Sequence, residues 1–438
     1  MADRFQVLIV GGGQAGIPLA WALAKAGKTV ALAERKYLGG SCVNFGCTPT
    51  KAAIASARVA QLARRGREFG LVIPTVEVDF PAVIERAQGL ALHDRHSLDK
   101  GLDGSRNPEL FRAHARLTGR TGDAFRVLIG DREIVADQVV LNTGTRTQIP
   151  AISGLDKLRY ITADNWLSRS ELPARLAVIG GGYIGMEMGQ FYRRMGSQVT
   201  IWQQGDRILE HEDPAISDAI QKFLEAEEIT FQLNATIDSV DQLGTEDVFI
   251  AVGRTPNTDD LGLETVGVER DAKGYVKIDK RLATNVAGIW AAGDIRGGPQ
   301  FTHTSWDDYR ILLSQMHGDG SRTTDRIVPY AVFTDPELGR VGLTERELKE
   351  QGRKYELKRF EMKRNGKARE LGEPEGFIQV LLEPGTGNIL GAACLCADAA
   401  ELVHMYVDIM NAGVSSHVIR DAVHIHPTLA EAIQSAVT

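Results

Sequence analysis

The sequence predicts an α/β protein with two Rossmann-like dinucleotide-binding domains and a C-terminal domain of α+β type. Two observations predict this fold class. A buried strand, a glycine-rich turn and a helix follow one another twice in the chain, whereas residues 327–438 carry alternating strands followed by helices. The 438 residues are enough for two to four domains with a buried core.

The composition excludes several classes of protein. The chain is 43% hydrophobic and 24% charged, as in ordinary soluble proteins, and no apolar run approaches the roughly 20 residues that a membrane span needs. The formal net charge of -7, without a long basic tract, argues against a nucleic-acid surface. The N-terminus does not resemble a signal peptide and the four cysteines fit a reducing compartment. We therefore expect a cytoplasmic protein whose partners are small molecules or copies of itself.

The first glycine motif lies near the N-terminus. Residues 5–10 are a continuous apolar run of buried parallel-strand type, and Gly11, Gly13 and Gly16 follow in the pattern Gly-x-Gly-x-x-Gly before a helical pattern. These glycines permit a tight turn, close approach of a pyrophosphate and packing of the helix on the sheet, in that order. A second strand ends at Glu34, 18 residues after Gly16, where a carboxylate can accept a hydrogen bond from a ribose hydroxyl. This arrangement predicts a dinucleotide site.

The same unit occurs again in the middle of the chain. Residues 176–179 form a predicted strand, and Gly180, Gly182 and Gly185 follow with the same spacing before another helical pattern. The next strand ends at Gln203, 18 residues after Gly185, so this glutamine is the counterpart of the acid in the first unit. Two such motifs predict two bound dinucleotides, and an internal duplication is the economical explanation.

The second copy is shorter than the first. From Ala115 to Gly144 there are 29 positions, whereas the matching path from Ala235 to Gly253 has 18, so about one hairpin is expected to be missing. A polar stretch over residues 318–326 is typical of a linker. The remaining patterns predict helix over 56–101 and strands over 111–117, 125–129, 133–141, 248–252, 377–382 and 389–394.

A close cysteine pair carries the strongest chemical signature. Cys42 and Cys47 lie five positions apart at the start of an alanine-rich helical pattern. Five residues of regular helix rise about 7.5 Å and turn through about 140°, whereas a disulfide tolerates a Cα separation only up to about 7 Å. We therefore expect a distorted turn, in which Asn44 and Gly46 take the unusual backbone angles.

The residues after this pair favour reactivity. We expect the helix to restart with Thr48 as its cap and Pro49 at its first position, and a helix N-terminus stabilises a thiolate. Lys51 adds positive charge. The alternatives are a structural disulfide, which is rare inside cells, and a zinc half-site, which needs a second ligand pair. Cys394 and Cys396 are a weak partner for zinc, and their apolar strand pattern indicates core cysteines.

Several motifs occur in an order that indicates a known family. They are Cys42-Val43-Asn44-Phe45-Gly46-Cys47-x-Pro49-Thr50-Lys51, both glycine motifs, Gly253-Arg254, Ala292-Gly293-Asp294 and His426-Pro427-Thr428-x-x-Glu431. Together they resemble the class I pyridine nucleotide-disulfide oxidoreductases, which include glutathione reductase, dihydrolipoamide dehydrogenase and mercuric reductase. The resemblance covers nearly the whole chain. Residues 298–302, 307–310 and 328–333 are most similar to the bacterial reactive-chlorine-responsive and mercuric-reductase-like flavin reductases.

The resemblance implies cofactors and domain limits. FAD would occupy the first dinucleotide site and NADP or NAD the second. The implied FAD-binding domain is discontinuous and spans residues 1–145 and 256–325, and the NAD(P)-binding domain spans residues 146–255. Residues 326–438 would form an α+β C-terminal dimerisation domain, which makes the protein a homodimer.

The resemblance also implies roles for individual residues. Cys47 would touch the flavin and Cys42 would exchange with substrate as the two halves of a redox-active disulfide. Lys51 would pair with Glu187 near the flavin nitrogen that accepts hydride, and Tyr183 would cover the nicotinamide pocket. Further expected cofactor-binding residues are Ala115, Thr143, Gly144, Gly253, Arg254 and Asp294, the last of them near the ribityl chain or the phosphates.

A histidine near the C-terminus is the expected acid-base group. A thiol product leaves Cys42 only if it is protonated, which calls for a base that titrates near neutral pH, and histidine is the natural choice. Pro427 stiffens the chain after His426, and Glu431 can hold the imidazole in one tautomer. The resemblance implies that this histidine reaches the dithiol of the other subunit. The alternative is that His424 and His426 are ordinary surface histidines.

The sequence also departs from the mercuric reductases. Residues 434–438 lack the C-terminal cysteine pair of those enzymes, and the histidine-glutamate pair that they lack is present. We therefore predict an FAD-dependent NAD(P)H oxidoreductase without a resident metal, which reduces a disulfide or another thiol-reactive oxidant. The alternatives are a mercuric or copper ion reductase on the same scaffold, and a redox-sensing flavoprotein with little turnover.

The preference between NADPH and NADH depends on the second dinucleotide site. Gln203 and Gln204 neither attract nor repel a 2′-phosphate strongly, and Arg207 is close enough in sequence to attract one. The sequence therefore predicts weak discrimination, with a slight preference for NADPH.

Overall fold

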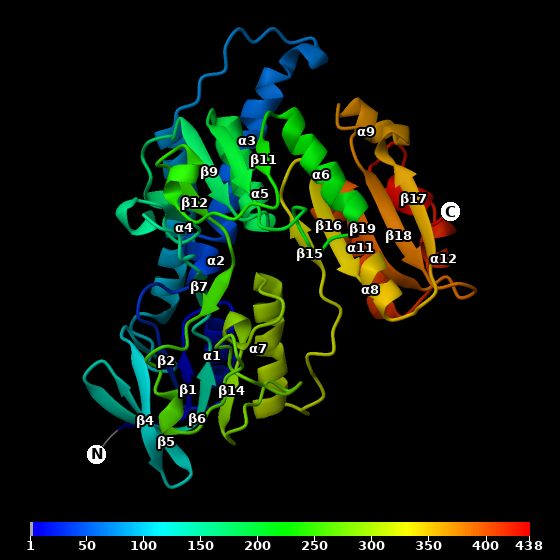
Figure 1. Ribbon diagram of the computed structural model, residues 1–438. Coiled ribbons are helices and arrows are strands. Elements are labelled where there is room, and N and C mark those ends of the chain that lie inside the picture. The colour runs from blue at the N-terminus through cyan, green and yellow to red at the C-terminus, as the bar shows by residue number, and fades with distance from the viewer. Residues whose placement is uncertain (1–2) are drawn as a thin grey trace.

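The first unit is a seven-stranded sheet formed by two separate segments of the chain (Figure 1). The computed structural model describes residues 3–438. The strands are β1 (Asp3–Val10), β2 (Val30–Ala33), β3 (Glu109–Phe111), β4 (Ala115–Thr121), β5 (Ala124–Ile129), β6 (Arg132–Leu141) and β14 (Ile289–Ala291). They follow the order β3-β2-β1-β6-β5-β4, and β14 pairs with β6 in parallel. Since β14 comes from residues beyond the second unit, the chain leaves this sheet and later returns to it.

Helices cover the first sheet and reach beyond it. They are α1 (Gly16–Lys25), α2 (Gly40–Asn44), α3 (Cys47–Arg64), α4 (Phe80–Leu102) and α7 (Thr302–His317). Helix α1 packs against α7, and α3 packs against α4 and against α5 of the second unit. The last four residues of β1 and all of β2 are buried, as expected for parallel strands with both faces covered.

The second unit is a five-stranded parallel sheet in the order β11-β10-β9-β12-β8. Its elements are β8 (Ile161–Thr162), β9 (Arg175–Ile179), α5 (Tyr183–Met195), β10 (Gln198–Trp202), α6 (Pro214–Ala226), β11 (Thr230–Gln232) and β12 (Val248–Ile250). At its two ends, β7 (Thr145–Thr147) pairs antiparallel with β13 (Arg254–Pro256). Between β11 and β12 the described chain has one short 3-10 turn, Val240–Leu243, where the first unit has the β4–β5 hairpin, so the predicted shortening is confirmed.

The third unit is an antiparallel sheet in the order β15-β16-β19-β18-β17, which lies beside the other two units (Figure 1). Its strands are β15 (Tyr330–Val332), β16 (Glu337–Gly342), β17 (Glu356–Glu361), β18 (Phe377–Leu382) and β19 (Ile389–Cys396). Its helices are α8 (Glu345–Glu350), α9 (Gly366–Glu370), α10 (Ala399–Leu402), α11 (His404–Ala412), α12 (His417–Arg420) and α13 (Glu431–Ser435). Cys394 and Cys396 on β19 are fully buried, which confirms their assignment to the core. Among residues 3–438, no helix combines the length and the apolar character needed to cross a bilayer.

Two predicted elements are divided in the structure. The helix expected over residues 56–101 is broken between α3 and α4, where Gly70 has a φ of +76° and Pro74 cannot continue a helix. The strand expected over residues 111–117 is β3 and β4 with a break between them. Arg112 lies in that break and donates to Asp99 and Asp103 at the end of α4, at 2.9 and 2.6 Å. Tertiary contacts therefore override the local strand pattern there.

The two glycine-rich turns have the same backbone geometry. Gly11 and Gly180 have φ angles of +111° and +112°. A Cβ atom on Gly16 would lie 2.1 Å from the backbone oxygen of Gly11, and one on Gly185 would lie 2.0 Å from that of Gly180. In each unit the third glycine is thus required by the close contact of helix and turn, which supports the internal duplication.

This geometry predicts different effects for two alanine substitutions in the second turn. Gly185→Ala would place a Cβ against the backbone, and it is expected to destabilise the protein by about 1–3 kcal/mol. Gly182→Ala would meet no atom within 4 Å, so stability should stay within about 0.5 kcal/mol of the parent. Both variants are expected to bind NAD(P)⁺ more weakly. Thermal unfolding and calorimetric titration measure the two effects, and a Gly185→Ala protein as stable as the parent would contradict the steric argument.

Candidate active site

Cys42 and Cys47 lie on either side of a break between α2 and α3. Phe45 (φ -155°, ψ -2°) and Gly46 (φ -98°, ψ -119°) leave the helical conformation between them. A Cβ on Gly46 would lie 2.8 Å from the backbone oxygen of Ser41, so glycine is needed for this close approach. The predicted distortion of the turn is confirmed. Both cysteines are free thiols here, so the structure holds the reduced form of the pair rather than the disulfide.

The details of the turn differ from the sequence prediction at two positions. Asn44 is the last helical residue of α2, and its side chain donates to two backbone oxygens at 2.8 Å, so it stabilises the turn without taking unusual angles. Thr48 is not the helix cap, because α3 begins at Cys47. Pro49 is consequently the third helical residue, in a first turn whose backbone N–H groups have no acceptor within the helix.

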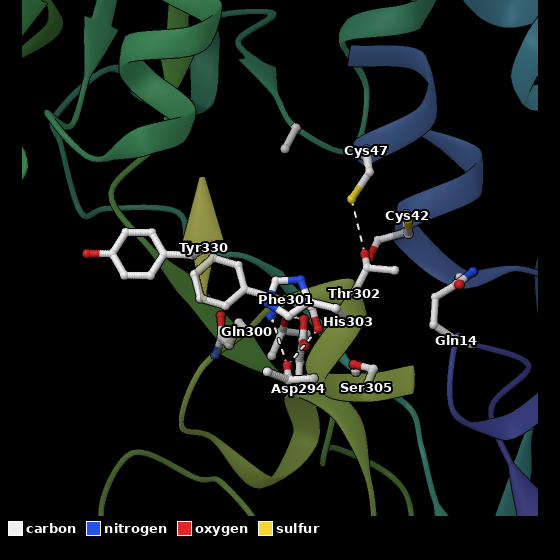
Figure 2. Close-up of a pocket in the computed structure, with 18 of the residues that line it drawn as sticks. Gln14, Cys42, Cys47, Asp294, Gln300, Phe301, Thr302, His303, Ser305 and Tyr330 are labelled. Atoms are coloured by element: carbon white, nitrogen blue, oxygen red, sulfur yellow. Dashed lines mark hydrogen bonds between the residues drawn. The ribbon is translucent and has the colours of Figure 1, made fainter. Parts of the chain in front are cut away.

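The two cysteines lie near Thr302, which contacts Cys47 (Figure 2), and the pKa values of their thiols differ. A hydrogen bond from Cys42 lowers the pKa of the Cys47 thiol to about 6, with further help from the Thr302 hydroxyl and the charge of Lys51. The Thr302 Oγ1 and Cys47 Sγ atoms are 3.1 Å apart, and the hydroxyl donates when the sulfur is a thiolate. The same hydrogen bond, together with burial, raises the pKa of Cys42 well above its ordinary value. Both shifts favour the thiolate on Cys47 and the proton on Cys42.

Lys51 and Glu187 form an ion pair next to the thiols. The Lys51 ammonium lies 2.8 Å from Oε2 of Glu187, whose side chain is only 5% exposed. The backbone N–H of Phe333 donates to the other carboxylate oxygen at 2.9 Å, and the Lys51 ammonium lies 4.4 Å from the centre of the Phe333 ring. Residues from α3, α5 and the third unit thus meet at one carboxylate.

A cavity of about 1490 Å³ connects the thiols with the first glycine turn. It is lined along its length by Gly13, Glu34, Cys42, Cys47, Lys51, Thr143, Gly144, Tyr183, Arg254 and Asp294. Asp294 is half-buried and accepts from the Thr145 hydroxyl at 3.2 Å, and loss of solvent around its carboxyl raises the pKa. A cavity of this volume, lined by a glycine turn and by a reactive thiol pair, fits FAD in size and chemistry.

The strand-end residues of the two units make the same contact. Glu34 accepts a hydrogen bond from the N–H of Gly12 at 2.8 Å, and Gln203 accepts one from the N–H of Gly181 at 2.7 Å. Ala115 lies with Glu34 at a small adjoining cavity of about 50 Å³, at the adenosine end of the first site. The sequence register that matched the two units therefore corresponds to matching positions in space.

Residues of the second glycine turn open onto the main cavity. Tyr183 lies at the start of α5, and its ring centre is 6.1 Å from that of Phe301. Burial raises the pKa of Tyr183 to about 12, so the phenol is neutral. Arg254, directly after Gly253, donates to the Thr145 hydroxyl at 2.7 Å. The structure thus brings residues of both dinucleotide motifs to one cavity.

The acid-base pair expected near the C-terminus lies elsewhere on the same chain. His426 Nδ1 and Glu431 Oε1 are 3.0 Å apart, and the histidine side chain is 77% exposed. A hydrogen bond from the Thr428 N–H lowers the pKa of the Glu431 carboxyl, and the hydrogen bond from His426 lowers it further. His426 does not line the thiol cavity, so a single chain does not bring it to Cys42.

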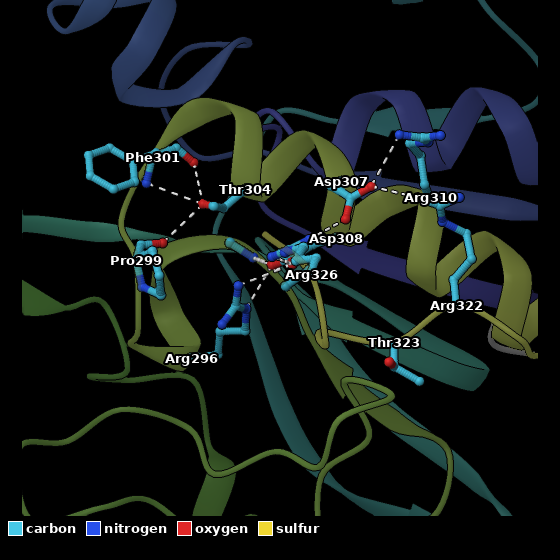
Figure 3. Close-up of polar contacts among 12 residues, drawn as sticks. Arg296, Pro299, Phe301, Thr304, Asp307, Asp308, Arg310, Arg322, Thr323 and Arg326 are labelled. Carbon is cyan, nitrogen blue, oxygen red and sulfur yellow. Dashed lines mark hydrogen bonds and ion pairs between the residues drawn. The ribbon is translucent and has the colours of Figure 1, made fainter. Parts of the chain in front are cut away.

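The stretch expected to be a linker is held against α7 (Figure 3). Arg326 donates to Asp307 and to Asp308, both at 2.6 Å. Arg322 donates to Asp307 at 2.9 Å, and Arg296 to Asp308 at 2.7 Å. Residues 318–326 do connect two units, but the ion pairs fix their path along one wall of the cavity, so the prediction of a simple linker was incomplete.

Two site residues were missed by sequence reasoning. Asn142 bridges the first unit, because its Oδ1 accepts from Gly16 N–H at 2.9 Å and its Nδ2 donates to the Ala292 oxygen at 2.8 Å. Its place between a buried strand and Thr143-Gly144 was a usable signal. Thr302 lies within the motif of residues 298–302, but that motif does not show that the hydroxyl reaches the sulfur of a residue 255 positions away.

Two dinucleotide turns and a reactive dithiol at one cavity define a nucleotide-dependent dithiol oxidoreductase. Residues 5–308 match the family model described as "Pyridine nucleotide-disulphide oxidoreductase", and residues 328–437 match the dimerisation domain of that family. The chain therefore belongs to the pyridine nucleotide-disulphide oxidoreductase family, as its motifs predicted, and is an FAD-dependent enzyme that uses NAD(P)H.

Individual relatives agree with this assignment. The chain is 32% identical over 449 residues to the probable pyridine nucleotide-disulfide oxidoreductase RclA of Escherichia coli (strain K12), with 98% of each chain covered. It is 31% identical to mitochondrial dihydrolipoyl dehydrogenase 1 of Arabidopsis thaliana, over 99% of this chain and 90% of the relative. A solved Cu(II) complex of the HOCl-induced flavoprotein disulfide reductase RclA from Escherichia coli has a TM-score of 0.88 and 32% identity over 98% of both chains. The predicted fold class is confirmed.

The contact between Thr302 and Cys47 predicts a measurable shift. Thr302→Val removes a donor to the thiolate, so the pKa of Cys47, now about 6, should rise by about one unit. Thr302→Ser keeps the hydroxyl and should stay close to the parent. Thiolate absorbance in the ultraviolet, followed against pH in the reduced protein, measures the shift. Equal titration midpoints for the valine variant and the parent would contradict a hydrogen bond to the sulfur.

Proposed function

We propose that this enzyme passes an electron pair from NAD(P)H through FAD and the Cys42–Cys47 dithiol to a disulfide or another thiol-reactive oxidant. The observation that carries the proposal is the placement of the Cys42–Cys47 pair in the cavity that residues of both dinucleotide motifs line, with the Thr302 hydroxyl 3.1 Å from Cys47 Sγ. Cys47 is the thiolate, held by Thr302 and Lys51, and Cys42 keeps a proton. A pair with one anionic sulfur and one protonated sulfur is suited to thiol-disulfide exchange in two steps.

With a disulfide substrate the steps balance as follows. Cys42 loses its proton to a base and attacks one substrate sulfur, which breaks the substrate S–S bond and releases the first thiolate. The first thiolate takes up a proton. Cys47 then attacks the sulfur of Cys42, so that the second substrate thiolate leaves and the Cys42–Cys47 disulfide forms. Two electrons from NAD(P)H restore the dithiol.

FAD would lie along the cavity described above, with Glu34 and the first glycine turn at its adenosine end and Asp294 near its middle. When bound, it supplies the chemistry that accepts hydride from the nicotinamide and delivers an electron pair to sulfur. Lys51, fixed by Glu187, would hold positive charge beside that group. Tyr183, neutral and largely buried, would exclude water from the nicotinamide side.

The base in this scheme is His426 of the partner subunit. Glu431 orients the imidazole, and in one chain the pair is exposed and away from the thiol cavity. Val423 is fully exposed and Ile425 is 79% exposed, so the same segment presents apolar side chains to its surroundings. A second copy of the chain, docked through the family's dimerisation domain, would cover these side chains and complete both sites.

A second candidate acceptor is a metal ion such as Cu(II). It is favoured by the Cu(II) complex solved for the RclA relative. Residues 3–438 contain no group of three or more His, Cys, Asp or Glu side chains arranged to hold a metal. A metal substrate would therefore bind to the thiol pair itself and leave after reduction. A redox sensor with little turnover is the third possibility.

Steady-state NAD(P)H oxidation against a panel of disulfides, quinones and metal ions separates these functions. We expect turnover with at least one disulfide that Cys42→Ser abolishes. Faster turnover with Cu(II) than with every disulfide would favour the metal reductase. If no acceptor exceeds the slow reaction with oxygen, the enzymatic proposal fails in favour of the sensor.

The proposed base predicts a selective defect. His426→Ala is expected to lose about a hundredfold in disulfide turnover, the usual range for a general acid-base group, whereas flavin reduction by NAD(P)H stays fast. His424→Ala is the matched control and should remain active. Stopped-flow measurement of flavin reduction and steady-state turnover distinguish the two half-reactions.

Subunit mixing tests whether the histidine acts across the interface. A heterodimer of His426→Ala and Cys42→Ser chains would hold one intact site and one doubly defective site. Such mixtures should therefore regain activity that neither parent variant has. Exchanged mixtures that stay inactive, or a fully active monomer, would rule out His426 of the partner subunit as the base.

A further inference from the structure

The second dinucleotide turn has a carboxylate close to it, Glu210, although the residue after its second strand is the uncharged Gln203. Gln203 directly follows β10, and its Oε1 accepts a hydrogen bond from the N–H of Gly181 at 2.7 Å. The other end of the same amide, Nε2, donates to Oε1 of Glu210 at 2.6 Å. The amide oxygen of Gln203 thus binds the glycine turn, and the amide nitrogen holds the carboxylate of Glu210 in place.

The first unit shows what this position contacts. There the strand-end residue, Glu34, accepts directly from the N–H of the middle glycine, Gly12, at 2.8 Å. In the second unit Gln203 makes this contact. The negative charge lies instead on Glu210, which is hydrogen-bonded to the Gln203 side chain. Since a strand-end acid in such a fold recognises the adenosine ribose, this carboxylate lies beside the ribose hydroxyls.

The segment that carries Glu210 is tied to the turn. Leu209 N–H donates to the oxygen of Gly181 at 2.8 Å, and Arg346 donates to the backbone oxygen of Glu210 at 2.8 Å. A Cβ on Gly205 would lie 1.8 Å from Oε1 of Glu210, so glycine leaves the space into which the carboxylate folds. The carboxylate is therefore held in place before any nucleotide arrives.

The two arginines near Glu210, Arg207 and Arg346, form contacts with other groups of the protein. Arg207, expected from the sequence to attract a 2′-phosphate, pairs with Asp218 on α6. Arg346 contacts the backbone oxygens of Glu210 and His211 and lies 3.9 Å from Glu350. A 2′-phosphate at this site would meet Glu210 before it met an uncommitted arginine.

We infer that Glu210 is a specificity-determining residue that makes the enzyme prefer NADH to NADPH. Its carboxylate accepts a hydrogen bond from the ribose 2′-hydroxyl of NADH and repels the 2′-phosphate of NADPH. This inference reverses the slight preference for NADPH that the sequence predicted, because the structure pairs Arg207 with Asp218 and places an acid beside Gln203. It concerns the nucleotide half-reaction and is independent of which oxidant the thiols reduce.

Flavin reduction without any electron acceptor tests the inference. In stopped-flow experiments the parent enzyme should favour NADH over NADPH by at least about tenfold in the second-order rate constant, which corresponds to about 1.4 kcal/mol. Glu210→Gln keeps an acceptor for Gln203 and removes the charge. It should lower the NADH preference at least about fivefold, mainly through tighter NADPH binding, and the change should shrink at high ionic strength.

Binding measurements provide a readout that does not depend on turnover. Calorimetric titration with NADP⁺ and NAD⁺ should show that Glu210→Gln and Glu210→Ala both gain affinity for NADP⁺ selectively. Glu225→Gln, which removes an acid at the far end of α6, is the matched control and should leave the ratio unchanged. The inference is overturned if the parent enzyme prefers NADPH, or if both Glu210 variants keep the parent ratio.

Discussion

The carboxylate of Glu187 is the contact on which the arrangement of the three units depends. It lies on α5 of the second unit, takes the ammonium of Lys51 from α3, and accepts the N–H of Phe333 from the third unit. Because the carboxylate is buried, both oxygens need partners, and each partner comes from a different part of the chain. This requirement holds the start of α5 and the thiol helix together at one cavity.

The thiol pair depends on that arrangement for its chemistry. A helix N-terminus alone favours a thiolate on either sulfur, but the hydrogen bond from Cys42 and the charge of Lys51 lower the pKa of Cys47 in particular. Cys42 becomes the donor in the pair and keeps its proton. The difference between the sulfur atoms therefore arises mainly within the pair itself, and burial adds to it at Cys42.

The duplication explains both the likeness and the difference of the two nucleotide sites. Both units keep the glycine turn because a side chain on Gly16 or Gly185 would collide with backbone. The strand-end residue is freer to change, since it needs only an acceptor for the middle N–H, and Gln203 supplies one as well as Glu34 does. The negative charge at the second site is therefore carried by Glu210, in the segment between β10 and α6, and we propose that this residue sets the preference between NADH and NADPH.

The sequence alone determined the fold class, both dinucleotide turns, the core position of Cys394 and Cys396 and the distorted cysteine turn, because each rests on local spacing and on steric limits of nearby residues. Only the tertiary structure decided how the two thiols differ, where residues 318–326 run, and which charged side chain lies beside Gln203. Thr302, Asp308 and Glu210 act on side chains or backbone that folding brings to them. No local pattern records such pairings, since their energies depend on distances between segments and not on the order of residues.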